Sequence, residues 1–397
     1  MEQPSNQGQE QGSAHEHGDW SPEEAGMAVR GTGGAADANT QLRCAQCGAP
    51  IVYAPGSHET LCEYCGHRNA IAADGVVEEQ DFHEAMAALE RGADVIERLT
   101  VECRACGAST EFEENVRSQE CPFCGTPIVA RAVSQRLIKP RALLPFALNK
   151  DQARGSFGAW IGKLWFAPND LKKSAWIDGH LAGLYLPFWT YDAQAVTRYS
   201  GERGDDYWDT VRVPVTVNGK TSWQTRQVRK TRWRRASGTV QNRFDDVLVP
   251  ASESLPHDRL RRLGGWDLGS LVPYAEAYVS GFRSESYSIC LEKGFVAARQ
   301  TMEEQIRGTI RHDIGGDHQR IHQMWPVYSA ITFKHLLLPI WVAVYRYKDK
   351  PYRILVNARN GTVSGERPWS VWKLSLAIGG GVLVLLVLVA LFLLLGR

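Results

Sequence analysis

Three patterns of hydrophobic positions divide this chain into different kinds of structure. The longest is a run from Leu374 to Leu395 that contains no charged side chain. Its 22 residues would span about 33 Å as a helix, close to the apolar thickness of a bilayer. Trp369 and Trp372 precede the run and are typical of a membrane interface. We therefore predict a transmembrane helix at 374–395, a tail anchor, rather than a buried helix of a soluble core.

A helical period is present in three further segments. In each, apolar residues recur every three or four positions, as the buried face of an amphipathic helix requires. The faces consist of Phe82, Ala85, Met86 and Leu89; of Ala153, Phe157, Trp160, Ile161 and Leu164; and of Met302, Ile306 and Ile310. The first segment predicts a linker helix within 76–100, and the other two predict helices of a larger domain at 131–370.

Alternation of apolar and polar residues predicts strands in the same domain. One strand has its apolar residues at Val211, Val213, Val215 and Val217. It leads into Asn218-Gly219, a pair that favours a type I′ hairpin turn. A second turn of this kind is predicted at Asn360-Gly361. Because strands and helices are mixed along 131–370, we expect an α+β fold.

The sequence Leu-Pro-x-Trp occurs twice in this domain, at 186–189 and at 338–341. Each copy follows one of the predicted helices and continues into an apolar strand. The repetition predicts that the domain consists of two similar halves.

Residues 1–40 have a different composition from the rest of the chain. They are rich in Gln, Glu, Gly, Ala and Ser, and they carry seven acidic residues against Arg30 alone. Such a segment buries too little apolar surface to offset the entropy of ordering. It is expected to be a disordered acidic tail.

Eight of the nine cysteines follow one repeated spacing. A Cys-x-x-Cys pair is separated by fourteen residues from a second pair, and glycine follows every pair. The residues are Cys44, Cys47, Cys62 and Cys65, and then Cys103, Cys106, Cys121 and Cys124. Two such turns facing each other place four thiolates tetrahedrally around one ion. We therefore predict two zinc ribbons, at 41–75 and 101–130, each holding one structural zinc ion.

Disulfides and iron are the alternatives for these cysteines. The N-terminal segment lacks a secretory apolar core, so a reducing compartment is expected and disulfides are disfavoured. The softness of the ligands does not separate zinc from iron, and both metals stay open. Four protein sulfurs complete the coordination of either ion, so the predicted sites are structural rather than catalytic.

A basic run follows the first predicted turn. Its cations are Arg226, Arg229, Lys230, Arg232, Arg234 and Arg235. Trp223 and Trp233 are interleaved with it, a combination found in grooves for single-stranded nucleic acid. The same charges suit anionic lipid headgroups. A solvated strand paired with acidic neighbours such as Asp205, Asp206, Asp209, Asp245 and Asp246 is the third interpretation, and the sequence leaves all three open.

No catalytic site and no small-molecule substrate are predicted. A cluster is formed by His312, Asp313, Asp317, His318 and His322. His318 and His322 would share a face if their segment were helical, but the sequence shows no matching general base and no third ligand of certain geometry. Gly219-Lys220 lacks the preceding glycine of a phosphate-binding loop.

The order of these parts resembles a bacterial family of membrane-anchored double-zinc-ribbon proteins, the YdjG-like group. The resemblance rests on the paired Cys-x-x-Cys-Gly quartets, on residues 185–189 and 338–341, on the Asn360-Gly361 turn and on the terminal span. It covers nearly the whole chain after residue 40. Members are often labelled as similar to primosomal protein N′, a superfamily II helicase, but this chain has no Walker A loop.

This resemblance implies a role in membrane stress. Such proteins are associated with recruiting coat proteins like phage-shock protein A, together with an SPFH-domain partner, to the cytoplasmic membrane. The chain would then be a single-pass inner-membrane scaffold without catalytic activity, its N-terminal domains in the cytoplasm. The alternative is a membrane-associated nucleic-acid-binding protein related to replication.

Overall fold

A computed structural model describes most of the chain after residue 41. The described residues are 42–72, 75–91, 95–103, 109–111, 118–120, 127–129, 133–168, 170–171, 181–217, 220–347 and 350–395. The predicted tail at 1–40 lies outside them, and so does the predicted turn at Asn218-Gly219.

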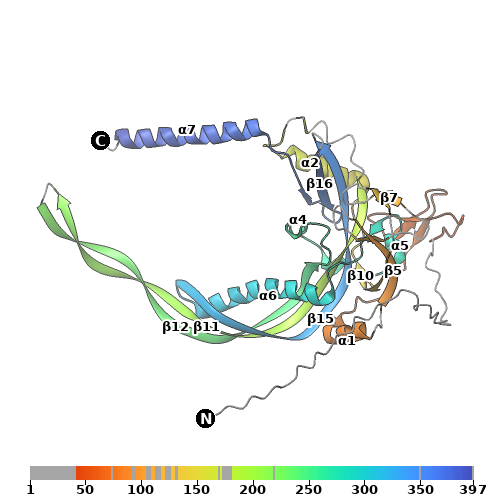
Figure 1. The fold of residues 1–397 in the computed structure, drawn as a ribbon, viewed down its shortest axis with the longest axis horizontal. Coiled ribbons are helices and arrows are strands. Elements are labelled where there is room, and N and C mark those ends of the chain that lie inside the picture. The colour runs from red at the N-terminus through yellow and green to blue at the C-terminus, as the bar shows by residue number, and fades with distance from the viewer. Residues whose placement is uncertain are drawn as a thin grey trace, which may run out of the picture. The chain divides into compact units, whose positions relative to one another are not determined.

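The described residues form helices and strands that are mixed along the chain (Figure 1), which confirms the α+β class. The helices are α1 (Phe82–Glu90), α2 (Lys150–Gly162), α4 (His257–Leu263), the 3-10 turn η1 (Leu268–Ser270), α5 (Glu276–Val279), α6 (Leu291–Ile314) and α7 (Val371–Leu395). The three predicted amphipathic segments are α1, α2 and α6. The linker helix is shorter than 76–100, since Val95–Glu102 is a strand.

The strands form one large sheet and three small ones. The large sheet contains β4 (Gln80–Asp81), β10 (Ala142–Leu143), β11 (Ala182–Val217), β12 (Lys220–Pro250), β13 (Val272–Pro273), β14 (Arg283–Ser284), β15 (His318–Tyr347), β16 (Lys350–Asn357) and β17 (Val363–Gly365). The small sheets contain β1 (Val52–Tyr53), β2 (Glu59–Leu61) and β3 (Arg68–Ala70); β5 (Val95–Glu102), β6 (Ser109–Glu111) and β9 (Val133–Ile138); and β7 (Ser118–Glu120) with β8 (Pro127–Val129).

The two Leu-Pro-x-Trp segments lie side by side at the centre of the large sheet. β11 and β15 pair antiparallel, and Leu186 is the register partner of Leu338. Pro187 then faces Leu337, and Pro339 faces Tyr185, so the pairing is symmetric about the two leucines. The predicted repeat therefore has a structural counterpart: its two copies meet along a local two-fold axis.

The surroundings of the two copies repeat as well. β14 pairs parallel to β11 at Leu184, and β10 pairs parallel to β15 at the equivalent Leu336. The indole of Trp189 donates to the carbonyl of Ile289 at 2.9 Å, and that of Trp341 donates to Leu148 at 3.0 Å. Both acceptors lie two residues before a helix, α6 and α2. Each half is thus a short strand, a helix and an antiparallel hairpin.

Helix α6 covers one side of the long β11–β12 hairpin, as Figure 1 shows. Its buried stripe includes the predicted Met302, Ile306 and Ile310, all fully buried against the hairpin and β15. The helix ends at Ile314, and Gly315 leaves it with a positive φ of 63° that suits glycine. The side chain of Ile314, the last residue of α6, lies beside Gly201 of β11. The residues between Gly201 and the hairpin turn therefore extend beyond the end of the helix.

A buried histidine lies at the junction of the two halves. His335 is 4% exposed, its ring centre lies 4.6 Å from that of Trp189 at a tilt of 37°, and its Nδ1 lies 2.9 Å from the carbonyl oxygen of Ile138. Nε2 has no hydrogen-bond partner among the described residues. Burial lowers the pKa of His335 to about 4, although the nearby backbone carbonyls act to raise it. The neutral tautomer with a proton on Nδ1 therefore fits the site.

The depressed pKa of His335 predicts that this residue makes the fold acid-sensitive. Between pH 6.5 and 4 the unfolded chain binds a proton at this histidine more tightly than the folded chain does. The contribution of neutral His335 to the free energy of unfolding is therefore complete above about pH 6.5 and is lost as pH falls. On going from about pH 8 to about pH 5 the loss should be about 2 kcal/mol. His335→Phe keeps an aromatic ring next to Trp189 and removes the imidazole that titrates.

The measurement is chemical denaturation of the detergent-solubilised chain at several pH values, comparing wild type with His335→Phe. The comparison with the variant is needed because Asp192 changes the stability in the opposite direction with pH. Burial raises the pKa of Asp192 to about 7, so its effect on stability becomes less favourable as pH rises. Parallel pH profiles for the two proteins would contradict the prediction.

Candidate metal centre

The first cysteine quartet is formed by two backbone knuckles of the same design. In each, the amide of the glycine after the pair donates to the carbonyl of the first cysteine, from Gly48 to Cys44 and from Gly66 to Cys62, both at 2.9 Å. Both glycines have positive φ, 72° and 74°, which a residue with a Cβ adopts at a cost. The Cys-x-x-Cys-Gly sequence therefore determines the turn locally, as the pattern predicted.

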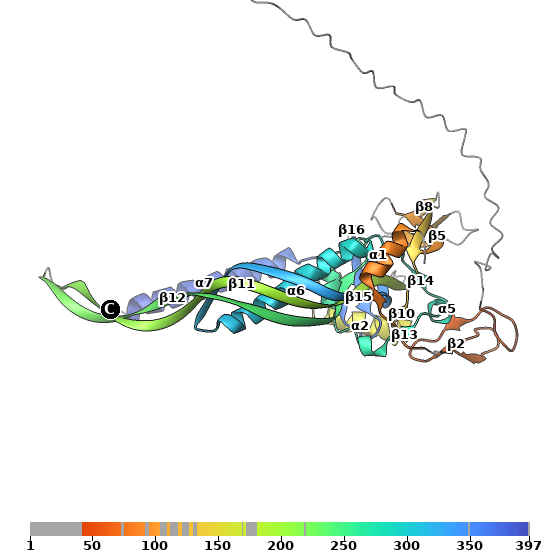
Figure 2. The ribbon, with the colours of Figure 1, turned by 90° about the horizontal axis from the view of Figure 1, so that it is seen from below.

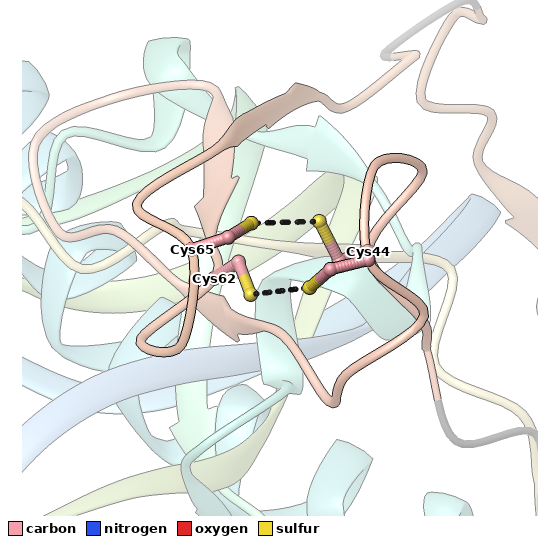
Figure 3. Close-up of side chains that lie close together, drawn as sticks. Cys44, Cys62 and Cys65 are labelled. Carbon is pink, nitrogen blue, oxygen red and sulfur yellow. Dashed lines mark hydrogen bonds between the residues drawn. The ribbon is translucent and has the colours of Figure 1, made fainter.

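The two knuckles bring four sulfur atoms together (Figure 3). Cys44 Sγ lies 3.6 Å from Cys65 Sγ, and Cys47 Sγ lies 3.5 Å from Cys62 Sγ. All four sulfurs lie within 4.8 Å of one another. A zinc–sulfur bond of about 2.3 Å in tetrahedral geometry requires sulfur separations of about 3.8 Å. The quartet thus has the donor set and nearly the spacing of a metal ion held by four thiolates.

The electrostatics of the four thiols favour a bound cation. Burial acts to raise the pKa of Cys44, but hydrogen bonds from the backbone of Cys47 and Gln46 lower it to about 6. At Cys65 the backbone hydrogen bond of His67 acts to lower the pKa, but burial and the neighbouring thiols raise it to about 12. One thiolate thus suppresses ionisation of the others, since like charges repel. A divalent cation removes this repulsion.

This ribbon is attached to the α+β domain by a set of contacts that the sequence did not indicate. The backbone amide of Tyr53 donates to Ser280, and the Ser280 hydroxyl donates to Ile51. Tyr53 is buried in the domain core, and the amide of Gly56 donates to Phe146. The ribbon is therefore fixed to α5 and to the loop after β10.

His58 belongs to this contact and not to the metal centre. Its Nδ1 lies 3.0 Å from the hydroxyl of Tyr278 in α5. Four cysteines complete the coordination of the ion, so the centre needs no histidine ligand.

The second quartet lies largely outside the described residues. Cys103 is described and buried, whereas Cys106, Cys121 and Cys124 are not described. Strands around them are described, and two of the first ribbon's pairings recur there at the offset that separates Cys44 from Cys103, whereas the β1–β2 pairing has no counterpart among the described residues. The pair of Leu61 and Arg68 in the first ribbon corresponds to the pair of Glu120 and Pro127 in the second. The pair of Arg43 and Pro50 corresponds in the same way to the pair of Glu102 and Ser109.

The basic run on β12 is partly neutralised by β11. Arg229 pairs with Asp206, Lys230 with Asp209 at 2.6 Å, and Arg234 with Asp205 at 3.1 Å. These contacts follow from the register, which places the acidic stretch of β11 opposite the basic stretch of β12. Arg232 stacks on Tyr207, with its guanidinium carbon 5.0 Å from the ring centre. Arg226 and Arg235 form no ion pair with any described residue.

The histidine cluster is dispersed. His318 and His322 lie on strand β15, not on a helix, and His312 lies in the last turn of α6. His318 Nε2 is 3.1 Å from Asp206 and His322 Nε2 is 3.7 Å from Glu202. Within the described residues these histidines do not form a three-ligand group.

One acidic group lies close enough together to hold an ion, namely Glu79, Asp192 and Asp245. The ammonium of Lys334 already occupies this region, 3.0 Å from Glu79 and 2.8 Å from Asp246. We interpret the group as an ion-pair network that attaches the segment before α1 to β15.

Helix α7 agrees with the predicted span and begins slightly earlier. The segment Val371–Leu393 is long and apolar enough to cross a membrane; its most apolar window of 18 residues has a mean hydropathy of 3.0, and none of that window is buried in the protein. Its base is tied to the loop after α2, because Lys373 Nζ donates to the carbonyls of Trp165 and Ala167 at 3.1 and 2.8 Å. Trp165, 79% exposed, thereby joins Trp369 and Trp372 at the start of the helix.

Comparison with known proteins gives one curated relative. The chain is 24% identical to the uncharacterized protein YdjG of Bacillus subtilis (strain 168) over 276 residues, which is 67% of this chain and 75% of that protein. No family model matches the chain. No solved structure matches it.

The first metal centre predicts a specific effect of losing one ligand. Cys62→Ser should lower the metal content of the purified protein by about one ion per chain, because three thiolates and a hydroxyl bind zinc weakly. It should also expose the small core of Cys44, Ile51 and Cys62. Elemental analysis and limited proteolysis of the ribbon measure the two effects. Cys290→Ser, which alters a cysteine outside the quartet, is the control, and an unchanged metal content in Cys62→Ser would contradict the assignment.

Proposed function

We propose that this chain is a membrane-anchored adaptor without catalytic activity, whose two zinc ribbons recruit protein partners. The observation that carries the proposal is the closed four-cysteine centre of a ribbon fixed to a rigid domain. Four protein sulfurs leave no open coordination position for a reacting water. Such a site holds a surface in place, and the apolar helix α7 would keep that surface at the membrane.

The second ribbon enters the proposal through its strands. The register of β7 with β8 repeats that of β2 with β3, and the same Cys-x-x-Cys-Gly sequences recur at the same offset along the chain. We assign one structural zinc ion to Cys103, Cys106, Cys121 and Cys124, as to the first quartet.

The exposed part of the first ribbon is where we place the partner. The residues between the paired cysteines are exposed, and Tyr64 is 86% exposed. An exposed aromatic side chain on a rigid turn is a frequent anchor of protein interfaces. By the resemblance of the sequence, the partners proposed are a coat protein like phage-shock protein A and an SPFH-domain protein, at the cytoplasmic face of the inner membrane.

The zinc assignment predicts two zinc ions per chain. Cys62→Ser/Cys65→Ser and Cys121→Ser/Cys124→Ser should each leave one, and the combined variant should leave none. Elemental analysis of the purified chain gives both the number and the identity of the metal. Iron in place of zinc would change the cofactor and keep the ligands, whereas a third ion retained in the combined variant would favour a metal site on the histidines.

The adaptor function predicts that partner capture depends on the ribbon surface. In-cell crosslinking followed by mass spectrometry should yield coat-like or SPFH-type proteins with wild type and lose them with Cys62→Ser/Cys65→Ser. Tyr64→Ser should reduce capture at least about tenfold while both zinc ions stay bound, because it removes an interface anchor and no ligand. Val76→Ser, at another exposed apolar position, is the matched control. If nucleic acid and replication proteins were captured instead, the alternative function would replace this one.

A further inference from the structure

The outer part of the β11–β12 hairpin is a two-stranded ribbon without a core. We call residues 205–214 and 222–235 the distal hairpin; they lie beyond the end of α6 (Figure 2). Residues 205–214 and 223–232 pair only with each other, whereas 233–235 pair with 202–204, which also pair with β15. No side chain described within it is buried. A two-stranded ribbon in water is at best marginally stable by itself. A surface that packs against this hairpin would therefore add stability that its own residues do not supply.

The charge of the distal hairpin is positive after its internal ion pairs are formed. Its acidic residues Asp205, Asp206 and Asp209 are all engaged with cations of the opposite strand. Arg212, Arg226 and Arg235 form no ion pair with any described residue, and Arg232 lies over an aromatic ring. The unneutralised cations are thus all arginines, and the complementary surface is anionic.

Its exposed aromatic residues are placed among these cations. Trp208 and Trp223 are 67% and 69% exposed. Trp223 is the register partner of Pro214, and paired residues lie on the same side of the ladder. Pro214 and Trp208 are an even number of positions apart on β11, so both tryptophans project from the same side. Val211 and Val213 lie between them in sequence, near the end of the hairpin, and project from the opposite side of the ladder. An apolar end with cations behind it matches the boundary between acyl chains and headgroups.

We propose that the distal hairpin binds the surface of a bilayer containing anionic phospholipid. Tryptophan is enriched at this depth of a membrane, and arginine side chains near the surface are attracted to anionic headgroups. A lipid surface is favoured over nucleic acid because the chain carries an apolar helix able to span a membrane and because apolar residues occupy the hairpin end. The inference requires neither the metal centres nor a protein partner.

The test is photocrosslinking of the full-length chain in nanodiscs. Trp223 is replaced by p-benzoylphenylalanine, and the discs contain phosphatidylcholine alone or mixed with phosphatidylglycerol. Irradiation should attach phospholipid at position 223, at least about fivefold more in the anionic discs. Arg226→Glu/Arg232→Glu/Arg235→Glu should abolish this excess. The same crosslinker at Val296, an exposed position on α6, gives the background.

A second set of reversals separates a local effect from one of net charge. Arg261→Glu/Arg307→Glu/Arg311→Glu changes the same number of charges on exposed helix positions and should leave the lipid adduct unchanged. Equal adducts at 223 and 296, or equal adducts in both kinds of disc, would overturn the proposal. An added single-stranded oligonucleotide that becomes crosslinked at 223 and displaces the lipid would reassign the surface to nucleic acid.

Discussion

The antiparallel pairing of β11 with β15 holds the rest of this structure in place. Each strand has a proline next to the symmetric pair of Leu186 and Leu338, and a proline has no amide to donate to a sheet. Their carbonyls are nevertheless used: Pro187 accepts from Ala251 and Pro339 from Ala358, each alanine being the residue after the returning strand of its hairpin. The prolines thus mark where each hairpin ends. Because both halves obey the same constraint, one register places both helices and both short parallel strands.

The metal centre is connected to this framework through buried aromatic residues. Tyr53 from the ribbon packs 5.3 Å from Tyr278, and its hydroxyl donates to the carbonyl of Phe146, which stacks on Phe282. Phe146 also packs against Tyr185 and Trp341, one from each central strand. The ribbon therefore has a fixed orientation on the domain, and its exposed knuckles are presented as a rigid surface.

Charge is distributed by the same register. The acidic and basic stretches of the long hairpin would each repel themselves if they were isolated, and pairing them across the ladder cancels part of each. What remains is an excess of arginine among exposed tryptophans at the end farthest from α6. The hairpin is stabilised by its own cross-strand pairs, and its surplus charge is left for another surface.

Sequence alone was sufficient wherever a feature depends on neighbours along the chain. The Cys-x-x-Cys-Gly turns, the apolar faces of α1, α2 and α6, the charge-free helix and the repeated Leu-Pro-x-Trp are all local patterns, and the structure bears out each one that it describes. Tertiary structure decided the contacts between distant segments. Examples are the contact of His58 with Tyr278 and the ion pairs of the basic run. Others are the pairing of His318 on β15 with Asp206 and the hydrogen bonds of Lys373 to the loop after α2. These depend on register and on which faces pack together, because a side chain's partner across a sheet is set by the pairing of whole strands and not by its own neighbours.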